Sequence, residues 1–249
     1  MAPQSAADLQ LSIVIPALDE ERSVGAVVTA HAALAREIAP RFEIIVCDDG
    51  STDGTWAVLT SLARVLPELR LVRHATNRRI PATMKELYGE ARGTWTYFTP
   101  ADGQVPPDAL RLMWAARGES SAVVGRRFPR RDPMVRTVMA RAYASLVATL
   151  FRLDVHDVDG VKLYRTADRR VHAAQSTSVF FEAEQLIRLS RFARGIVEVT
   201  VPHLPRTTGH PKAVTFDSTL AALRDVVSFA WQVYTGAAAA QAARLRPQQ

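Results

Sequence analysis

Short apolar runs alternate with longer segments of helical periodicity over the first hundred residues, and this alternation limits the folds open to the chain. The pattern predicts strands at 11–16, 42–47, 69–73 and 94–99, and helices at 20–39, 55–66 and 81–92. Strands that alternate with helices favour a mainly parallel sheet. Ligands of such sheets bind beyond the carboxyl ends of the strands, so the segments after residues 15, 47 and 98 are where chemistry is expected.

The second half of the chain is less regular. Its apolar runs predict strands at 122–125, 160–165 and 196–201, and helices at 134–151, at 180–191 and from residue 216. Residues 226–243 carry no formal charge, but several polar side chains interrupt them, and a spanning helix needs roughly 20 predominantly apolar residues. We therefore expect a helix in water or along a surface, and any membrane contact to be peripheral, at the inner face.

Charge and cysteine content narrow the partners. The chain has 31 Lys and Arg against 25 Asp and Glu, a net charge of +6 that favours an anionic partner such as a nucleotide, a phosphorylated lipid or a membrane surface. Cys47 is the only cysteine, which excludes an intramolecular disulfide and a thiolate zinc cage. The N-terminus lacks the basic and apolar regions of a signal peptide. These features predict a cytoplasmic protein.

Acidic residues follow the first two predicted strands. Residues 15–21, IPALDEE, place three acids after a strand, where they also suit the first turn of a helix. In CDDGSTDGT, Asp48 and Asp49 end the second strand and could hydrogen-bond a base or ribose, or help to hold a metal. Asp53, further along the same turn, is better explained as a cap of the next helix.

A third acidic segment, TPADGQVPPDAL at 99–110, follows the fourth strand. Asp102 and Gln104 are two residues apart, so both side chains can converge on one cation from a single loop. A hard divalent cation prefers such oxygen ligands and would neutralise charge on a nucleotide diphosphate. The alternative is a surface turn before a helix that starts near Pro107.

Together these three segments resemble glycosyltransferase family 2, which has the GT-A fold. ADGQVPP is most similar to the polyprenol-phosphate (dolichol-phosphate) mannosyl- or glucosyltransferase branch, whose loop reads D-A-D-x-Q-x-P-P. Three later segments continue the resemblance in the correct order: VVGRR at 123–127, DVDGVKLYR at 157–165 and RTTGHPK at 206–212. The resemblance spans roughly residues 11–214.

The resemblance implies an α/β GT-A fold, with a Rossmann-like, mostly parallel sheet flanked by helices. It implies one domain at 11–215, between an N-terminal tail at 1–10 and a helical segment at 216–249. Residues 11–115 would form its nucleotide-sugar half and residues 116–215 its acceptor half.

The resemblance also implies a role for each matched residue. Donor binding would involve Pro16, Leu18, Glu20, Asp48, Asp49 and Asp102. Asp102 and Gln104 would hold Mg²⁺ or Mn²⁺, and Asp102, Arg127 and Arg206 would be catalytic. Phosphate of the acceptor would meet Arg127, Arg131, Arg206 and Lys212.

The sequence departs from the family pattern at several positions. Pro100 replaces the first aspartate of the D-A-D triplet, so the metal loses a carboxylate. Arg79 and Pro81 replace glycines, which makes a positive-φ turn costly there. Asp159 and Pro211 replace serines of the later motifs. These changes concern metal and acceptor positions more than nucleotide positions, so nucleotide binding is better supported than the acceptor.

We predict an inverting, metal-assisted transfer of a sugar, from GDP-mannose or UDP-glucose, to a polyprenyl phosphate. An anionic lipid phosphate needs no general base, whereas a hydroxyl acceptor would require a carboxylate such as Asp157, Asp159 or Glu182. One alternative is therefore transfer to a soluble or natural-product hydroxyl. Another is a nucleotide-binding protein without transferase activity.

A basic segment follows the predicted strand at 122–125. This segment forms either a solvated face or a lid over phosphates. Its arginines are at positions 126, 127, 130, 131 and 136. An arginine suits a phosphate because it can donate two parallel hydrogen bonds to its oxygens. Nucleic acid is not expected as a partner, because the aromatic residues of a single-strand platform are missing. The helix at 134–151 is either core-facing or lipid-facing with basic flanks.

Overall fold

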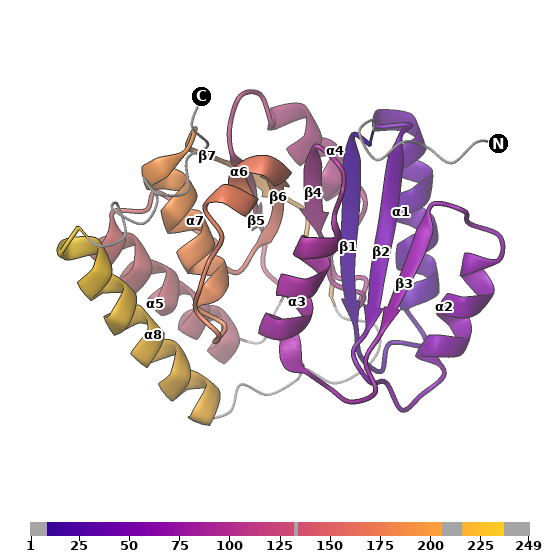
Figure 1. Cartoon of the computed structure of the whole chain (residues 1–249), viewed down its shortest axis with the longest axis horizontal. Helices are drawn as coiled ribbons and strands as arrows, with labels where there is room; N and C mark the ends of the chain where they lie inside the picture. The colour runs from indigo at the N-terminus through magenta and orange to yellow at the C-terminus, as the bar shows by residue number, and fades with distance from the viewer. Residues whose placement is uncertain (1–8, 132–133, 206–215, 237–249) are drawn as a thin grey trace.

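The computed structural model describes residues 9–131, 134–205 and 216–236, which fold around one seven-stranded sheet with the strand order β3-β2-β1-β4-β6-β5-β7 (Figure 1). The strands are β1 (Leu11–Ala17), β2 (Phe42–Asp48), β3 (Leu69–Arg73), β4 (Trp95–Phe98), β5 (Ala122–Arg127), β6 (Val161–Arg165) and β7 (Ile196–Val201). The helices are α1 (Val24–Ile38), α2 (Thr55–Ala63), α3 (Arg79–Glu90), α4 (Asp108–Ala116), α5 (Met134–Phe151), α6 (Thr166–Val171), α7 (Phe181–Phe192) and α8 (Phe216–Tyr234).

Strand direction brings the functional segments to one edge of the sheet. β1 to β4 are parallel, so their carboxyl ends lie together. β6 is antiparallel to β4 and to β5, with Phe98 opposite Lys162 and Gly125 opposite Val161. The end of β5 and the start of β6 therefore reach the same edge as the ends of the first four strands.

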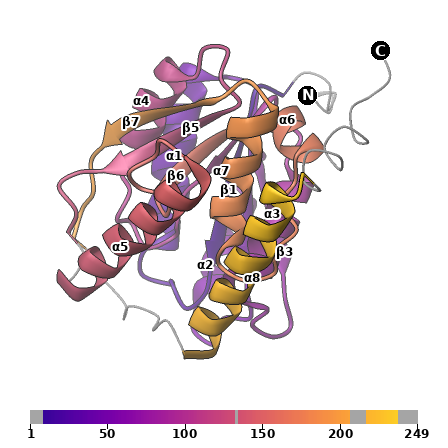
Figure 2. The ribbon, with the colours of Figure 1, turned by 90° about the vertical axis from the view of Figure 1, so that its left-hand side faces the viewer.

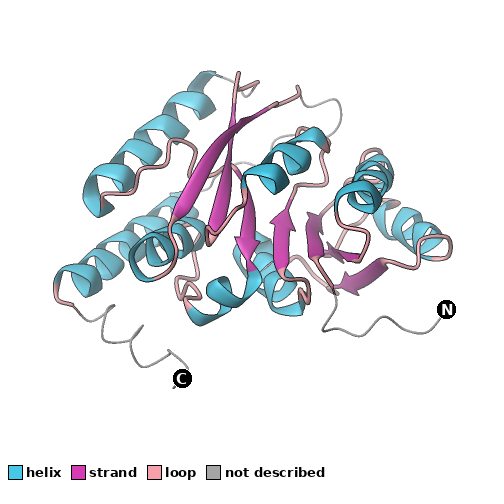
Figure 3. Cartoon of the chain, turned by 90° about the horizontal axis from the view of Figure 1, so that it is seen from above, coloured by secondary structure: helices cyan, strands magenta, loops and turns pink. Residues whose placement is uncertain are grey.

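Burial explains why the central strands are predominantly apolar. All seven residues of β1 and of β2 are buried, as expected for parallel strands covered on both faces. One apolar core joins the sheet to α1, α2 and α4, and a second joins the opposite face to α3, α5, α7 and α8. Figure 3 shows the sheet between these two helical layers. The sheet flanked by helices that we predicted is confirmed.

Several elements differ from the prediction. α1 begins at Val24 rather than at Glu20, because residues 18–23 form the loop that the acidic motif occupies. α3 runs from Arg79 to Glu90 and not from Pro81, and Gly93 does not end it. A Cβ on Gly93 would lie 2.6 Å from the backbone of Leu11, so this glycine allows a close approach of two chain segments. The short helix α6 was not predicted.

No helix in the ranges 9–131, 134–205 and 216–236 combines the length and the apolar content that crossing a bilayer requires.

Candidate active site

Hydrogen bonds from backbone N–H groups to side-chain carboxylates connect the loops after β1 and β2. Asp19 Oδ1 accepts from the Thr52 N–H at 2.8 Å, and Glu21 Oε2 accepts from the Gly54 N–H at 2.9 Å. Asp53 Oδ2 accepts in turn from the Glu21 N–H at 3.1 Å. These three acids therefore shape the edge of the sheet by satisfying loop amides.

Asp53 precedes Gly54, the N-cap of α2, so it is not the cap that we predicted, but it bonds to the start of the helix. Its Oδ1 accepts from both the N–H (2.9 Å) and the hydroxyl (2.5 Å) of Thr55, the first residue of that helix. Desolvation favours the neutral carboxyl, but the hydrogen bonds from Thr55 and Glu21 outweigh it and hold the pKa of Asp53 below its ordinary value.

The residues expected near the base and ribose lie at the ends of β1 and β2. Pro16 is buried within β1, opposite Cys47 of β2, and Leu18 is half-buried just beyond the strand. Glu20 is buried, accepts from the Ser23 hydroxyl at 2.9 Å, and donates its N–H to the Thr55 hydroxyl at 2.8 Å.

Asp48 is fully buried at the end of β2. Its Oδ1 accepts from the Ser51 N–H at 3.0 Å. Its Oδ2 has no hydrogen-bond partner within the described residues, although the Arg73 guanidinium lies 3.4 Å away. A buried acceptor without a hydrogen bond is costly, so this oxygen is suited to receive a donor from a ligand.

Asp49 anchors the loop between β3 and α3. Its Oδ1 accepts from the Arg78 N–H at 2.8 Å and lies 2.6 Å from Nδ1 of His74. Nε2 of His74 lies 3.1 Å from Glu86, which also pairs with the Arg78 guanidinium at 2.7 Å. Sequence reasoning missed His74 and Glu86; the signal available was a histidine directly after the third strand.

The acids around His74 also affect the pKa of the Cys47 thiol. Burial, together with the charges of Asp49 and Glu86, raises the pKa of the Cys47 thiol to about 12. Cys47 is therefore a structural residue at the end of β2, and its thiol is unsuitable as a nucleophile at neutral pH.

Asp102 and Gln104 lie in the loop after β4, and both are buried. Asp102 Oδ1 accepts from the Gln104 N–H at 3.0 Å, while Gly103 between them adopts a φ of +73°. The carbonyl of Gln104 accepts from the Leu204 N–H at 2.8 Å. This hydrogen bond ties the loop to the segment after β7. The loop follows β4, which lies two strands from β2 in the sheet, about 10 Å by inter-strand spacing.

A second cluster, rich in arginine, lies where β5 ends. The Arg127 guanidinium donates to both oxygens of Asp157, from Nε at 2.8 Å and from Nη2 at 2.9 Å, and Arg130 lies 3.4 Å from the same carboxylate. A cavity of about 310 Å³ adjoins it, with Arg126, Arg127, Arg130 and Arg141 in its wall. The structure thus brings arginines from β5, from the following loop and from α5 around one buried acid.

The three carboxylates considered as general bases have different surroundings. Burial opposes ionisation of Asp157, but Arg127 and Arg130 outweigh it and hold its pKa below the ordinary value. Glu182 accepts from the hydroxyls of Tyr88 at 3.0 Å and Tyr164 at 2.9 Å. Asp159 is exposed. Charge pairing makes Asp157 a weak base.

Two predicted phosphate contacts, Arg206 and Lys212, lie outside the described residues. Arg131 is exposed, and its backbone N–H donates to Nδ1 of His203 at 3.0 Å.

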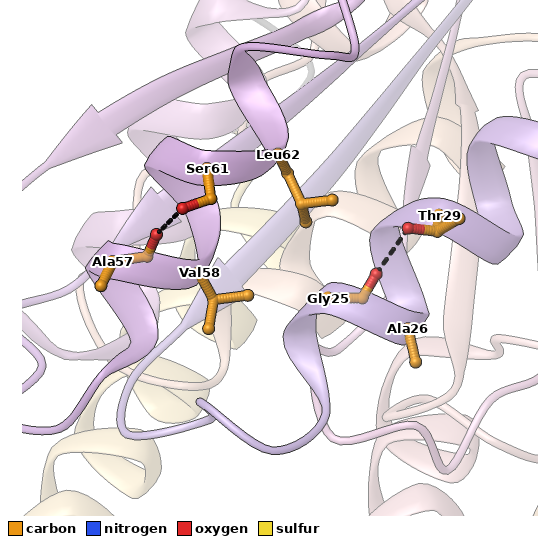
Figure 4. A pocket seen from close by; sticks show the side chains of 7 residues that line it. All are labelled: Gly25, Ala26, Thr29, Ala57, Val58, Ser61 and Leu62. Atoms are coloured by element: carbon orange, nitrogen blue, oxygen red, sulfur yellow. Dashed lines mark hydrogen bonds between the residues drawn. The ribbon is translucent and has the colours of Figure 1, made fainter.

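A larger hollow, of about 700 Å³, lies elsewhere, between α1 and α2 (Figure 4). Small and apolar side chains line it, among them Ala26, Val58 and Leu62, and no charged group does. Size alone would therefore direct attention away from the edge where the polar residues gather.

Comparison with known proteins identifies the family of the chain. The sequence model described as Glycosyl transferase family 2 matches residues 12–176. Undecaprenyl-phosphate 4-deoxy-4-formamido-L-arabinose transferases of Yersinia pestis (strain Pestoides F) and Yersinia enterocolitica are each 27% identical over 208 residues, which is 82% of this chain and 62% of the relative. The chain thus spans less than two thirds of the length of these relatives.

Solved structures show the same fold. Glucosyl-3-phosphoglycerate synthase from Mycobacterium tuberculosis, in complex with Mn²⁺, UDP and glucosyl-3-phosphoglycerate, gives a TM-score of 0.66 at 17% identity, covering 88% of this chain and 79% of that one. The complex of that enzyme with Mg²⁺ and UDP gives 0.67 at 15% identity, with the same coverage. The predicted GT-A fold is confirmed.

Proposed function

Because the chain belongs to glycosyltransferase family 2, we propose that this glycosyltransferase moves a sugar from a nucleoside diphosphate to a polyprenyl phosphate, with inversion at the anomeric carbon. UDP-glucose and GDP-mannose are the proposed donors. The observation that carries the proposal is the arginine cavity, which lies at the same edge of the sheet as the acidic loops. The names of the Yersinia relatives, which act on undecaprenyl phosphate, support the acceptor class.

The donor would bind over the ends of β1, β2 and β4. Asp48 has a buried Oδ2 without a hydrogen bond, which suits a donor group of the base or ribose. Pro16, Leu18 and Glu20 would border the same pocket. Asp49 would act by holding the loop at 74–78 in place, since its Oδ1 is committed to that loop.

Asp102 and Gln104 fit a divalent cation that arrives with the diphosphate. Both residues offer hard oxygen ligands from one loop. Within the described ranges, no group of three His, Cys, Asp or Glu side chains could hold a metal without such help from the substrate. Mg²⁺ is commonly bound by one or two protein ligands together with phosphate and water. Bound there, Mg²⁺ or Mn²⁺ would supply positive charge beside the leaving diphosphate.

The acceptor phosphate would occupy the arginine cavity. Its anionic oxygen forms the new bond to the anomeric carbon while the bond from that carbon to the diphosphate breaks, and the diphosphate leaves with the electron pair. Arg127 and Arg130 would hold the phosphate, assisted by Arg131 and, from outside the described residues, by Arg206 and Lys212. Interactions that strengthen as negative charge grows on the diphosphate accelerate such a step.

The surroundings of two of the three acids considered as bases favour a phosphate over a hydroxyl acceptor. A hydroxyl needs a base, yet Asp157 is held charged by two arginines and Glu182 is bonded to two tyrosines. A phosphate acceptor needs neither acid as a base, and Asp157 then serves to orient Arg127.

A screen of donors against acceptors tests the function. UDP-glucose and GDP-mannose are each incubated with a short-chain polyprenyl phosphate or with a panel of alcohols, and products are identified by mass spectrometry. We expect a glycosyl lipid phosphate of inverted configuration, and about a hundredfold slower transfer by Arg127→Ala. Transfer to alcohols alone, or no product from any pair, would contradict the proposal.

A further inference from the structure

A histidine lies among the arginines of the cavity at the end of β5. His156 forms part of the wall of this 310 Å³ cavity, and its side chain is 63% exposed, so the ring is accessible to a ligand there. Figure 2 shows the surrounding elements, with β7 beside β5 and α5 next to them. The arginines balance the charge of an acceptor phosphate, but they provide no group that could accept its proton.

Glu198 of β7 fixes the orientation of the His156 ring. Its Oε2 lies 2.8 Å from Nδ1 of His156, and its Oε1 accepts from the backbone N–H groups of His156 at 2.8 Å and Asp157 at 3.1 Å. Because an ionised carboxylate only accepts hydrogen bonds, Nδ1 must carry the hydrogen. In the neutral ring Nε2 is then the acceptor, and it is the ring nitrogen left for a ligand.

The cavity is rich in hydrogen-bond donors and poor in groups that can hold a proton. Among the described residues of its wall, only Asp157 and His156 can take up a proton. Both oxygens of Asp157 already accept from the Arg127 guanidinium, at 2.8 and 2.9 Å. Ser145, also in the wall, can share a hydrogen bond but does not keep a proton. Nε2 of His156 is therefore the group suited to a proton that a ligand brings with it.

A phosphate monoester brings such a proton. Its second pKa is about 6, so in neutral to slightly acidic solution part of it carries a P–O–H group. A fully ionised phosphate needs no base, but the protonated form becomes a better nucleophile when a neighbouring base removes its proton. Imidazole exchanges protons in the same range of pH.

We propose that His156 is a catalytic residue that takes the remaining proton of the acceptor phosphate at Nε2. This role rests on the proposed function, because the acceptor and the cavity are the same. The O–H bond of the phosphate breaks and its proton moves to Nε2. The freed oxygen forms the bond to the anomeric carbon, and the diphosphate leaves with the electron pair of the bond that breaks. Glu198 accepts from Nδ1–H, stabilises the imidazolium and acts as a positioning residue.

Charged groups from four elements act on His156. Those in the cavity wall are Arg126 and Arg127 of β5, Arg130 of the following loop and Arg141 of α5, and they favour the neutral ring. Asp157 of its own loop and Glu198 of β7 favour the imidazolium. A bound phosphate adds negative charge to the second group. The ring can therefore be neutral before the acceptor binds and charged in the complex.

The pH profile of transfer tests this role. The kcat/KM for a short-chain polyprenyl phosphate is measured between about pH 5 and 8 for the parent, His156→Gln and Glu198→Gln. We expect His156→Gln to approach the parental rate at the alkaline end, where the acceptor is already dianionic, and to be about tenfold slower or worse at the acidic end. Glu198→Gln should show a smaller loss of the same kind. A loss of equal size at every pH, or no loss at any pH, would overturn the proposal.

Asp154→Asn is the matched control. Asp154 is exposed on the same loop, two residues before His156, and is not among the described residues of the cavity wall. This variant removes a charge from the loop but no proton acceptor from the cavity, so its profile should keep the parental shape. A profile shifted as in His156→Gln would assign the effect to the general field of the loop and contradict the role of His156.

Phosphorus NMR separates this role from the proposed function. A short-chain isoprenyl phosphate is titrated with pH in the presence of the full chain and no donor, because its resonance follows the protonation of the phosphate. The bound phosphate should protonate at a lower pH in the parent than in His156→Gln. That difference without transfer from any donor would contradict the proposed function and leave the role of His156 standing. Transfer to the phosphate with the same titration in both proteins would do the reverse.

Discussion

The two halves of the sheet edge are polar in different ways. In the nucleotide half, Asp19, Glu21 and Asp53 accept hydrogen bonds from backbone amides of neighbouring loops. In the acceptor half, the acid Asp157 accepts from the side chains and one amide of an arginine-rich segment. Backbone amides thus hold the carboxylates of the loops after β1 and β2, whereas guanidinium groups are the main partners of Asp157.

This difference has a functional consequence. Amide donors held by a folded loop keep one position, so the nucleotide half is preorganised for its ligand. An ion pair can exchange partners, since a phosphate offers Arg127 and Arg130 the same kind of oxygen that Asp157 does. We therefore expect variants in the nucleotide half to change the stability of its loops or the turnover of the donor. Variants in the acceptor half should leave arginine charge without its carboxylate partner and lower the free energy of unfolding.

The largest effect is expected from Asp157→Ala. The variant removes the buried carboxylate to which the guanidinium groups of Arg127 and Arg130 donate, and breaking a buried pair in this way costs about 3–5 kcal/mol of unfolding free energy. Chemical denaturation measures it.

The pH dependence of that loss has a defined sign. The pKa of Asp157 is lowered in the folded state, so its stabilisation is present above its ordinary value of 3.8 and disappears as the pH falls through the lower folded value. The difference between parent and variant should shrink below pH 3.8. A difference that is constant with pH would contradict the charge-pair account.

Asp102→Asn should abolish donor turnover without unfolding the protein. Loss of the carboxylate that would hold the cation and diphosphate should slow turnover about a hundredfold or more. Asp108→Asn is the control, because Asp108 is 77% exposed at the start of α4 and should leave turnover unchanged. Full activity of Asp102→Asn would remove this residue from the site.

Asp53→Ala tests the hydrogen bonds between loops in the nucleotide half. Loss of the two hydrogen bonds that Asp53 accepts from Thr55 should lower the unfolding free energy by about 1 kcal/mol. Thermal denaturation measures the change. A loss as large as that of Asp157→Ala would show that the two halves do not differ as we describe.

A change of similar size and opposite sign is expected from Arg79→Gly. Arg79 adopts a φ of +69°. The family pattern has a glycine at this position, and we predicted that a positive φ would be costly for the arginine. Glycine removes that cost, so the variant should be more stable by about 1 kcal/mol, measured by thermal denaturation. A destabilised variant would mean that contacts of the arginine side chain outweigh its backbone strain.

The fold could be predicted because its signals are local. Predominantly apolar runs located β1 and β2, and the strand ends located the acidic loops, because burial on both faces favours apolar side chains in such strands. Ser12 and Glu43 are the buried polar exceptions within the runs, and they hydrogen-bond to each other. α6 has only six residues, too few for a periodic pattern, and the start of α3 was misplaced because Pro81 suggested a first turn.

The side-chain pairing in the site could not be predicted in the same way. Arg127 and Asp157 are thirty positions apart, and His74 and Asp49 twenty-five, so only the folded sheet brings them together. The sequence indicated which residue types reach the edge. It held no signal for which of them pair with one another and which face a ligand.

The central claim is that the loops after β1, β2 and β4 bind a nucleoside diphosphate with a divalent cation. Isothermal titration calorimetry of the parent and of Asp102→Asn with UDP and with GDP, in the presence of Mn²⁺ or of a chelator, tests it most directly. We predict saturable binding of at least one nucleotide by the parent, strengthened by Mn²⁺, with the Mn²⁺ dependence lost in Asp102→Asn. Absence of binding of either nucleotide at millimolar concentration would contradict the account.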